Sequence, residues 1–166
     1  MVGILMGSKS DLDVVRNAFD VLDSFGVPFT ARILSAHRTP QEAADFAENA
    51  EKNGIKVIIC AAGMAAHLGG VIAAHTTLPV VGIPMVSEPF KAADSLLSVV
   101  QMPPGIPVAA VTCGKAGAKN AALYAVSILA LGNKELADKL KEFRIQQRNQ
   151  VLSADAELQQ ELSCRH

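Results

Sequence analysis

The stretch Val57-Ile-Ile-Cys-Ala-Ala-Gly63 decides the fold class of this chain. Its residues are apolar without interruption up to Ala61, and Gly63 bounds the run, which is typical of a short strand that is buried on both faces. Such strands belong to parallel sheets that helices cover on both sides. Four other apolar runs have the same character, and they predict strands at Val2–Met6, Phe29–Leu34, Pro79–Ile83 and Pro107–Cys113.

Segments with helical spacing of apolar residues separate these strands. They are Asp11–Ser24, Thr39 to about Asn53, Ala65 to about His75, Asp94–Gln101 and Ala118–Leu131. Asp11 is the predicted N-cap of the first helix, and Thr39-Pro40-Gln41-Glu42 is a predicted capping box for the second. A charged amphipathic helix is predicted from Lys134 to about Leu152, and a weaker helix after it.

The alternation of strands and helices predicts an α/β fold. We expect a three-layer, doubly wound parallel sheet of about five strands, flavodoxin-like, with a C-terminal helical extension. The length predicts a single domain over residues 1–166, with the helical tail from about residue 133. Sheets of this kind bind ligands at the carboxyl ends of their strands, so the loops that follow the strands are the expected site.

Composition excludes several classes of protein. Half of the residues are apolar, 19% are charged and the net charge is −1, which argues against disorder and against nucleic acid as the main partner. The longest uncharged apolar run, Ala121–Gly132, is too short to span a membrane, and no secretory signal is visible, so we expect a cytoplasmic protein. Three widely spaced cysteines predict neither a disulfide framework nor a zinc site.

Charged residues are unevenly distributed along the chain. Residues 54–131 contain six charged side chains, whereas the last 35 residues contain twelve. A middle segment that is poor in charge and rich in Ala and Gly predicts faces that are hidden against other subunits. We therefore expect a homo-oligomer.

The loop after the first strand, Gly7-Ser8-Lys9-Ser10-Asp11, has polar groups suited to a nucleotide. It is neither a P-loop nor a Gly-x-Gly-x-x-Gly motif. Ser8 and Ser10 nevertheless offer hydroxyls, and the helix N-terminus offers backbone N–H groups, to a phosphate. Asp11 is suited to ribose hydroxyls. A plain N-cap turn is the alternative interpretation of the same spacing.

The loop after the second strand, Ser35-Ala36-His37-Arg38, pairs a titratable side chain with a cation. Histidine is the side chain whose ordinary pKa suits acid–base catalysis near pH 7, and arginine binds anions through charge-assisted hydrogen bonds. We interpret His37 as a proton-transfer group beside the anion anchor Arg38. A surface loop with two ordinary polar residues is the alternative.

The loops after the other strands carry weaker signals. Glycines in residues 62–70 let backbone N–H groups face a ligand, but the pattern alone favours a structural role for His67. Neither His67 nor His75 has a metal-binding partner at ligand spacing, so no metal site is predicted. Lys115 is either an anion contact or a solvated lysine. Together the loops predict a phosphate-bearing small molecule and an acid–base histidine, with neither a metal nor a nucleotide cofactor.

Six segments, in this order and at this spacing, resemble the PurE family of purine biosynthesis. They are Met6–Asp11, Ser35–Pro40, Gly63–Leu68, Asp94–Ser98, Gln101–Pro103 and Gly114–Asn120. The resemblance covers residues 2 to about 145. It is closer to bacterial mutases than to animal-type carboxylases, which carry a Lys after the His of the second loop and Gly-Arg-Ser-Asn in the third. Met64 and Gly69 depart from the common third loop, Gly-Gly-Ala-Ala-His-Leu-Pro-Gly.

The resemblance implies a mutase that moves a carboxylate from N5 to C4 of an aminoimidazole ribonucleotide, without ATP or a metal. It implies that His37 is the general acid–base, and that Ser8, Asp11 and Arg38 bind the nucleotide with Ser10 close to the phosphate. The carboxylate pocket is implied to lie between the loop of Ser35 and the loop Gly63–His67. The substrate-binding residues of these two loops are Ser35, Ala36, Gly63, Met64, Ala65, His67 and Leu68.

Family members are octamers with sites at subunit junctions, which agrees with the charge-poor middle segment. Two other functions stay open. The same fold can act as a direct aminoimidazole ribonucleotide carboxylase that uses CO2, or as a non-catalytic nucleotide-binding protein. A flavodoxin is disfavoured, because one Tyr and no Trp leave few aromatic rings to enclose a flavin.

Overall fold

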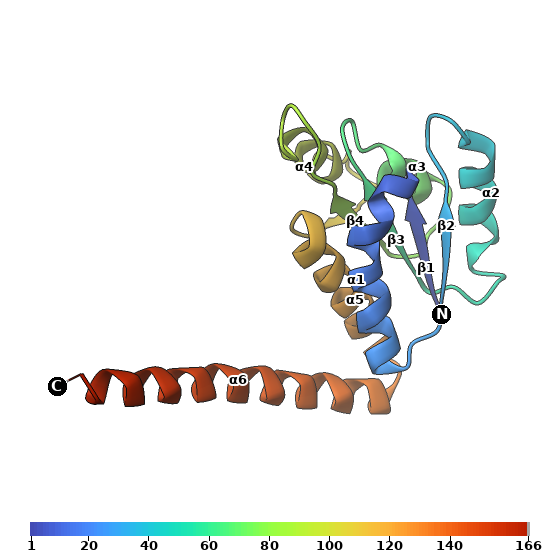
Figure 1. Ribbon diagram of the computed structural model, residues 1–166. Coiled ribbons are helices and arrows are strands. Elements are labelled where there is room, and N and C mark those ends of the chain that lie inside the picture. The colour runs from blue at the N-terminus through green and yellow to red at the C-terminus, as the bar shows by residue number, and fades with distance from the viewer. Residues whose placement is uncertain (166) are drawn as a thin grey trace. The chain divides into compact units, whose positions relative to one another are not determined.

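The computed structural model describes residues 1–165, and these contain one five-stranded parallel sheet (Figure 1). Its order is β2-β1-β3-β4-β5, which is the order of flavodoxin-like doubly wound sheets, so the predicted fold class is confirmed. β1, β3 and β4 are buried along their whole length, as continuous apolar runs predict. The strands are β1 (Val2–Met6), β2 (Phe29–Ile33), β3 (Val57–Ala62), β4 (Val80–Pro84) and β5 (Ala109–Ala110).

Helices cover both faces of the sheet. They are η1 (Lys9–Asp11), α1 (Leu12–Phe25), α2 (Pro40–Ala50), α3 (Leu68–Ala74), α4 (Ala93–Val100), α5 (Gly114–Ala130) and α6 (Lys134–Ser163). Apolar residues of α2, α3 and α4 form one core cluster with Leu5, Ile58 and Cys60 of the sheet. α1 and α5 lie together on the opposite side of the sheet (Figure 1).

The fifth strand and the helix after it differ from the prediction. β5 contains two residues instead of the seven of Pro107–Cys113, and it pairs only with β4. Pro107 lacks an N–H donor, and an edge strand has a neighbour on one side only, so little holds a longer strand in place. α5 begins at Gly114, four residues earlier than predicted. Gly117 allows this, because a Cβ there would lie 1.7 Å from the carbonyl oxygen of Thr112.

The C-terminal segment is one continuous helix of 30 residues, α6, where a charged helix to about Leu152 and a weaker helix after it are predicted. No Gly or Pro lies between its ends, and the side chain of Asn133 caps its first turn by accepting from the N–H of Leu136. The chain forms two compact units, Met1–Ile128 and a second that starts at Leu129. A single domain over residues 1–166 stays a prediction.

Candidate active site

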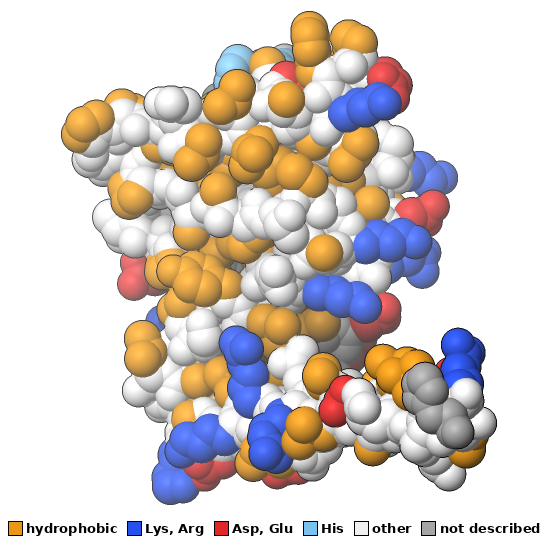
Figure 2. Space-filling view, turned by 90° about the vertical axis from the view of Figure 1, so that its left-hand side faces the viewer, with side chains coloured by type: hydrophobic (Ala, Val, Ile, Leu, Met, Phe, Trp, Pro, Cys, Tyr) orange, Lys and Arg blue, Asp and Glu red, His pale blue; other side chains and the backbone are white. Residues whose placement is uncertain are grey.

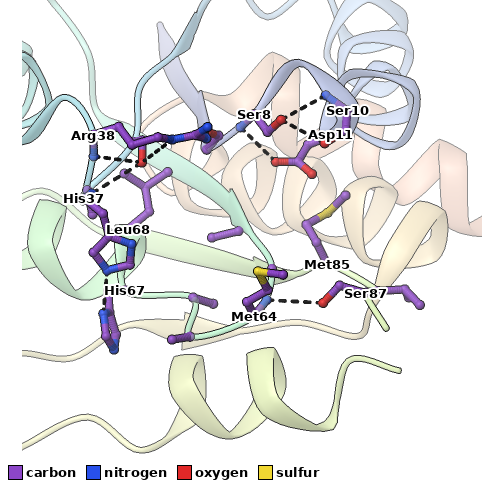
Figure 3. A pocket seen from close by; sticks show the side chains of 18 residues that line it. Ser8, Ser10, Asp11, His37, Arg38, Met64, His67, Leu68, Met85 and Ser87 are labelled. Atoms are coloured by element: carbon purple, nitrogen blue, oxygen red, sulfur yellow. Dashed lines mark hydrogen bonds between the residues drawn. The ribbon is translucent and has the colours of Figure 1, made fainter. Parts of the chain in front are cut away.

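A cavity of about 650 Å³ opens at the carboxyl ends of β1, β2, β3 and β4 (Figure 3). Its size is typical of pockets for small molecules. The structure brings all of the predicted site residues to its walls: Ser8, Ser10, Asp11, Ser35, Ala36, His37, Arg38, Gly63, Met64, Ala65, His67 and Leu68. In the described part of the chain, Lys115 and its loop contribute nothing to the lining of this cavity.

The loop after β1 forms a tight polar turn. Ser8 is the N-cap of η1: its hydroxyl accepts from the N–H of Ser10 at 3.3 Å, and the carboxylate of Asp11 accepts from the N–H of Ser8 at 3.1 Å. Asp11 holds the N-cap position of α1 as predicted, but its side chain makes no cap bond to α1, because the carboxylate turns back to Ser8. The two serine hydroxyls are 2.9 Å apart at the cavity wall.

The charged form of Asp11 is disfavoured in this turn, because burial removes part of its hydration. Partial burial raises the pKa of its carboxyl above the ordinary 3.8, although hydrogen bonds from Ser8 and Ser10 and the charge of Arg38 act in the opposite direction. A carboxylate that has lost part of its hydration gains from any ligand that offers it hydroxyl donors.

Ser35 organises the loop after β2. Its hydroxyl accepts from the backbone N–H groups of His37 and Arg38, at 3.3 and 3.2 Å, and thereby fixes both residues at the strand end. The Thr39 hydroxyl accepts from the N–H of Ser35 at 2.8 Å and donates to the carbonyl oxygen of Ser35. It makes no cap bond to α2, so the predicted capping box is wrong, although the helix begins at Pro40 as expected.

Arg38 links two of the loops. Its Nη2 donates to the carbonyl oxygen of Gly7 at 2.7 Å, which ties the loop after β2 to the loop after β1. A guanidinium has five N–H donors, so it can hold this carbonyl and still bind a phosphate or carboxylate oxygen. Figure 3 shows Arg38 on the same side of the cavity as Ser8 and Asp11.

His37 and His67 lie in direct contact, although 30 residues separate them in the sequence. Nε2 of His37 is 2.8 Å from Nδ1 of His67, and the rings meet edge to face with centroids 5.0 Å apart. One nitrogen of such a contact donates and the other accepts, so the pair shares a proton. His67 thus faces the proposed acid–base residue across the cavity wall.

The loop after β3 contains a residue in an unusual conformation. Met64 has φ 56°, in the left-handed region that costs an L residue about 1–2 kcal/mol. Its N–H donates to the hydroxyl of Ser87 at 3.4 Å, which ties this loop to the loop after β4. Gly69, the second departure from the common loop, lies in the first turn of α3, where a Cβ would make only ordinary contacts with Val108 and Cys60.

The cavity has two chemically different ends. Ser8, Ser10, Asp11 and Arg38 form a polar end, the two histidines lie beside Leu68, and Met64 lies apart from them beside Met85 and Ser87 (Figure 3). The polar end fits a sugar phosphate. The apolar end fits a planar heterocycle held beside a group that transfers protons.

Comparison with known proteins places the chain in a family. A family model described as AIR carboxylase matches residues 1–150. This chain belongs to the AIR carboxylase family. An N5-carboxyaminoimidazole ribonucleotide mutase of Saccharolobus solfataricus is 53% identical over 94% of this chain and 98% of the relative. A mutase of Bacillus subtilis is 50% identical over 95% and 98%. The crystal structure of Treponema denticola PurE superposes with a TM-score of 0.86 at 32% identity, covering 95% of this chain and 97% of that one.

Six residues beyond the predicted ones also line this cavity. The loop after β4 contributes Met85, Val86 and Ser87, and Gly7, Ala62 and Ala66 complete the lining. The position of Ser87, directly after a predicted strand, was the available signal.

Among residues 1–165 no group of three or more His, Cys, Asp and Glu side chains is placed to hold a metal ion. Within the same residues, no helix has the length and apolar character needed to cross a membrane.

We predict that Asp11→Asn changes how stability depends on pH. The folded-state pKa of Asp11 is raised, so its contribution to stability is present below the unfolded-state value and is lost as pH rises through the folded-state value. Asparagine can accept the same N–H bond and does not titrate. The free energy of unfolding of the variant, relative to the wild type, should therefore be higher at pH 7 than at pH 4. Urea unfolding at both values measures it, and a pH-independent difference would contradict the prediction.

Proposed function

We propose that this chain performs the reaction named for its curated relatives. It is an N5-carboxyaminoimidazole ribonucleotide mutase of de novo purine biosynthesis. The observation that carries this function is an identity of 50–53%, over nearly the whole length of both chains, to proteins of that activity. The remaining steps of the proposal assign roles to the residues of the cavity.

The polar end of the cavity binds the ribose phosphate in this proposal. The hydroxyls of Ser8 and Ser10 hold the phosphate, and Asp11 accepts from the ribose hydroxyls. Arg38 binds an anionic oxygen with the N–H groups that Gly7 does not use. This arrangement directs the imidazole ring toward the apolar end and His37.

His37 moves one proton in two steps. It donates the proton to N5 of the substrate as the N5–carboxylate bond breaks, which releases CO2 and an amine. C4 then attacks the carbon of the trapped CO2, and His37 takes the proton that C4 carried. The product is 4-carboxy-5-aminoimidazole ribonucleotide. Atoms, electrons and protons balance without any co-reactant, because the reaction is an isomerisation.

Retention of CO2 decides whether the second step succeeds. Reactants held in place reach effective concentrations of about 10⁵–10⁸ M, whereas CO2 that leaves the cavity is diluted into water. Apolar lining such as Leu68 beside the histidines serves this step by keeping polar groups away from CO2. His67 supports the first step by holding the ring of His37 through the 2.8 Å contact.

We also propose a homo-oligomer, which the family resemblance indicates is an octamer. Large apolar side chains are exposed on the Met1–Ile128 unit, among them Val86, Phe90, Leu97 and Tyr124. Figure 2 shows hydrophobic side chains gathered on one face of this unit. Patches of this kind are usually covered in a stable assembly. Two of these residues, Val86 and Phe90, lie in or beside the loop after β4 that lines the cavity.

The function is tested by offering two substrates separately. We expect turnover of N5-carboxyaminoimidazole ribonucleotide, generated in situ without added bicarbonate, and little turnover of aminoimidazole ribonucleotide with bicarbonate. The ultraviolet absorbance of the carboxylated imidazole measures both. Efficient use of the second substrate would identify a direct carboxylase, and product from neither would favour a nucleotide-binding protein.

Two substitutions separate chemistry from binding. His37→Asn should lower kcat at least about 100-fold while leaving nucleotide affinity near that of the wild type, because only proton transfer is lost. Arg38→Ala should raise the dissociation constant about 10- to 100-fold, because a charge-assisted hydrogen bond is lost. Steady-state kinetics and calorimetric titration with a nucleotide product measure the two effects. Substantial mutase activity in His37→Asn would contradict the assignment.

The oligomer is tested on α4. Leu97 is 58% exposed, and Leu97→Asp should break a contact between subunits and lower the mass in solution. Lys52→Asp, in the exposed turn after α2, is the control that should keep the wild-type mass. Size-exclusion chromatography with light scattering measures both variants. A monomeric wild type at micromolar concentration would refute the proposed assembly.

A further inference from the structure

Three lining residues, Met64, Met85 and Ser87, form a wall of the cavity that the proposed roles leave unused, and we call it the methionine wall. Figure 3 shows it apart from the two histidines and apart from the polar end. Met64 and Met85 present thioether chains to the cavity. The hydroxyl of Ser87 is therefore the side-chain hydrogen-bond donor of this wall.

Contacts on both sides of Ser87 hold it at the cavity. Before it, the N–H of Met85 donates to the carbonyl oxygen of Ala62 at 2.9 Å, and the buried hydroxyl of Ser95 donates to the carbonyl oxygen of Met85 at 2.9 Å. After it, the N–H of Lys91 donates to the carbonyl oxygen of Ser87 at 2.8 Å. The position of this hydroxyl is therefore set by the strand end and by the loop that follows it.

The hydroxyl of Ser87 has an unused proton. A Cβ at Gly63 would lie 3.6 Å from its oxygen, so the loop after β3 packs directly against it. The oxygen accepts from the N–H of Met64 at 3.4 Å, whereas its own proton has no acceptor among residues 1–165. A half-buried hydroxyl of this kind on a pocket wall is available to a ligand that carries an acceptor.

The proposed reaction sets which edge of the substrate ring faces this wall. The imidazole ring carries ribose on N1 and the amino nitrogen N5 on C5, and its other positions are C2, N3 and C4. The polar end holds the ribose phosphate, and His37 acts at N5 and C4. N1 then points to the polar end and the C4–C5 edge to the histidines, so the C2–N3 edge faces the methionine wall. N3 has a lone pair in the ring plane and no proton, which makes it an acceptor.

We infer that the hydroxyl of Ser87 donates a hydrogen bond to N3 of the substrate ring and thereby orients the ring. This inference rests on the proposed function. The bond needs only a rotation of the hydroxyl proton, because the oxygen can continue to accept from Met64. N3 keeps its lone pair in substrate and product, so the bond holds C4 and N5 toward His37 throughout the reaction. Ser87 thus distinguishes an imidazole from a ring that has no acceptor at this position.

Two ligands that do not react test this bond. One is the ribose 5′-phosphate of imidazole-4-carboxylate, and the other is the matching pyrrole-3-carboxylate, in which C–H replaces N3. Both lack the amino group that drives decarboxylation, so the protein binds them without turnover. Calorimetric titration in mildly alkaline buffer, where N3 carries no proton, gives dissociation constants for the wild type, Ser87→Ala and the control Ser24→Ala. Ser24 is exposed in the last turn of α1, where its hydroxyl donates to the carbonyl oxygen of Val21.

The expected result is a preference that depends on Ser87. The wild type and Ser24→Ala should bind the imidazole ligand about 2- to 10-fold more tightly than the pyrrole ligand, which is the effect of one net hydrogen bond. In Ser87→Ala the dissociation constant of the imidazole ligand should rise by that factor, while that of the pyrrole ligand stays near the wild-type value. A purely structural role, through the N–H of Met64, would weaken both ligands equally.

Other results overturn the inference. Equal weakening of both ligands in Ser87→Ala, or a preference for the imidazole ligand that persists in this variant, refutes the bond to N3. Either result leaves the mutase function intact if the wild type converts N5-carboxyaminoimidazole ribonucleotide. A wild type that neither converts this substrate nor binds either ligand would remove the proposed function and the inference together.

Discussion

The parallel direction of four adjacent strands is the constraint on which the rest of the molecule depends. β1, β2, β3 and β4 run the same way, so their following loops meet at one edge of the sheet. Helices on both faces bury the strands and leave this edge open. Residues from four distant parts of the sequence are thereby held around one cavity by the register of the sheet, and no loop has to supply the site alone.

Hydrogen-bonding contacts between the loops give the site at this edge a defined geometry. Arg38 bonds to the carbonyl of Gly7, His37 contacts His67, and the N–H of Met64 bonds to Ser87. Each contact joins loops that follow different strands, so a shift of one loop is resisted by its neighbour. The polar and apolar ends of the cavity can then differ in chemistry while they keep a fixed separation, which the proposed reaction through a trapped CO2 requires.

Much of the fold and of the site follows from local patterns in the sequence. Continuous apolar runs predict β1, β3 and β4 because burial on both faces leaves no polar position in the strand. The positions of Ser8, His37 and Arg38 follow from the rule that ligands bind at strand ends. Local patterns fail where a competing partner lies elsewhere in the chain or in the structure. Thr39 bonds to Ser35 instead of capping α2, and the carboxylate of Asp11 bonds to the N–H of Ser8 instead of capping α1.

The role of His67 shows most clearly where prediction from sequence patterns ends. Apolar neighbours in the sequence favour a structural histidine, but the fold brings it to His37 across 30 residues. Sequence spacing carries no information on such a contact, because it depends on how β2 and β3 flank β1. Met85 and Val86 are not among the predicted site residues for a related reason: they are apolar, and only the fold brings them into the pocket wall, Met85 beside Gly63.

The direction of β1 has a practical consequence for attaching this protein to a surface. β1 begins at Val2 and runs toward the cavity, so the amino terminus lies at the opposite edge of the sheet, about 17 Å away along the strand (Figure 1). Its ammonium group bonds to the carbonyl of Gly54 in the turn before β3, which anchors it at that edge. A tether or affinity handle joined there points away from the substrate entrance of the same chain, and immobilised protein keeps that entrance facing the solution.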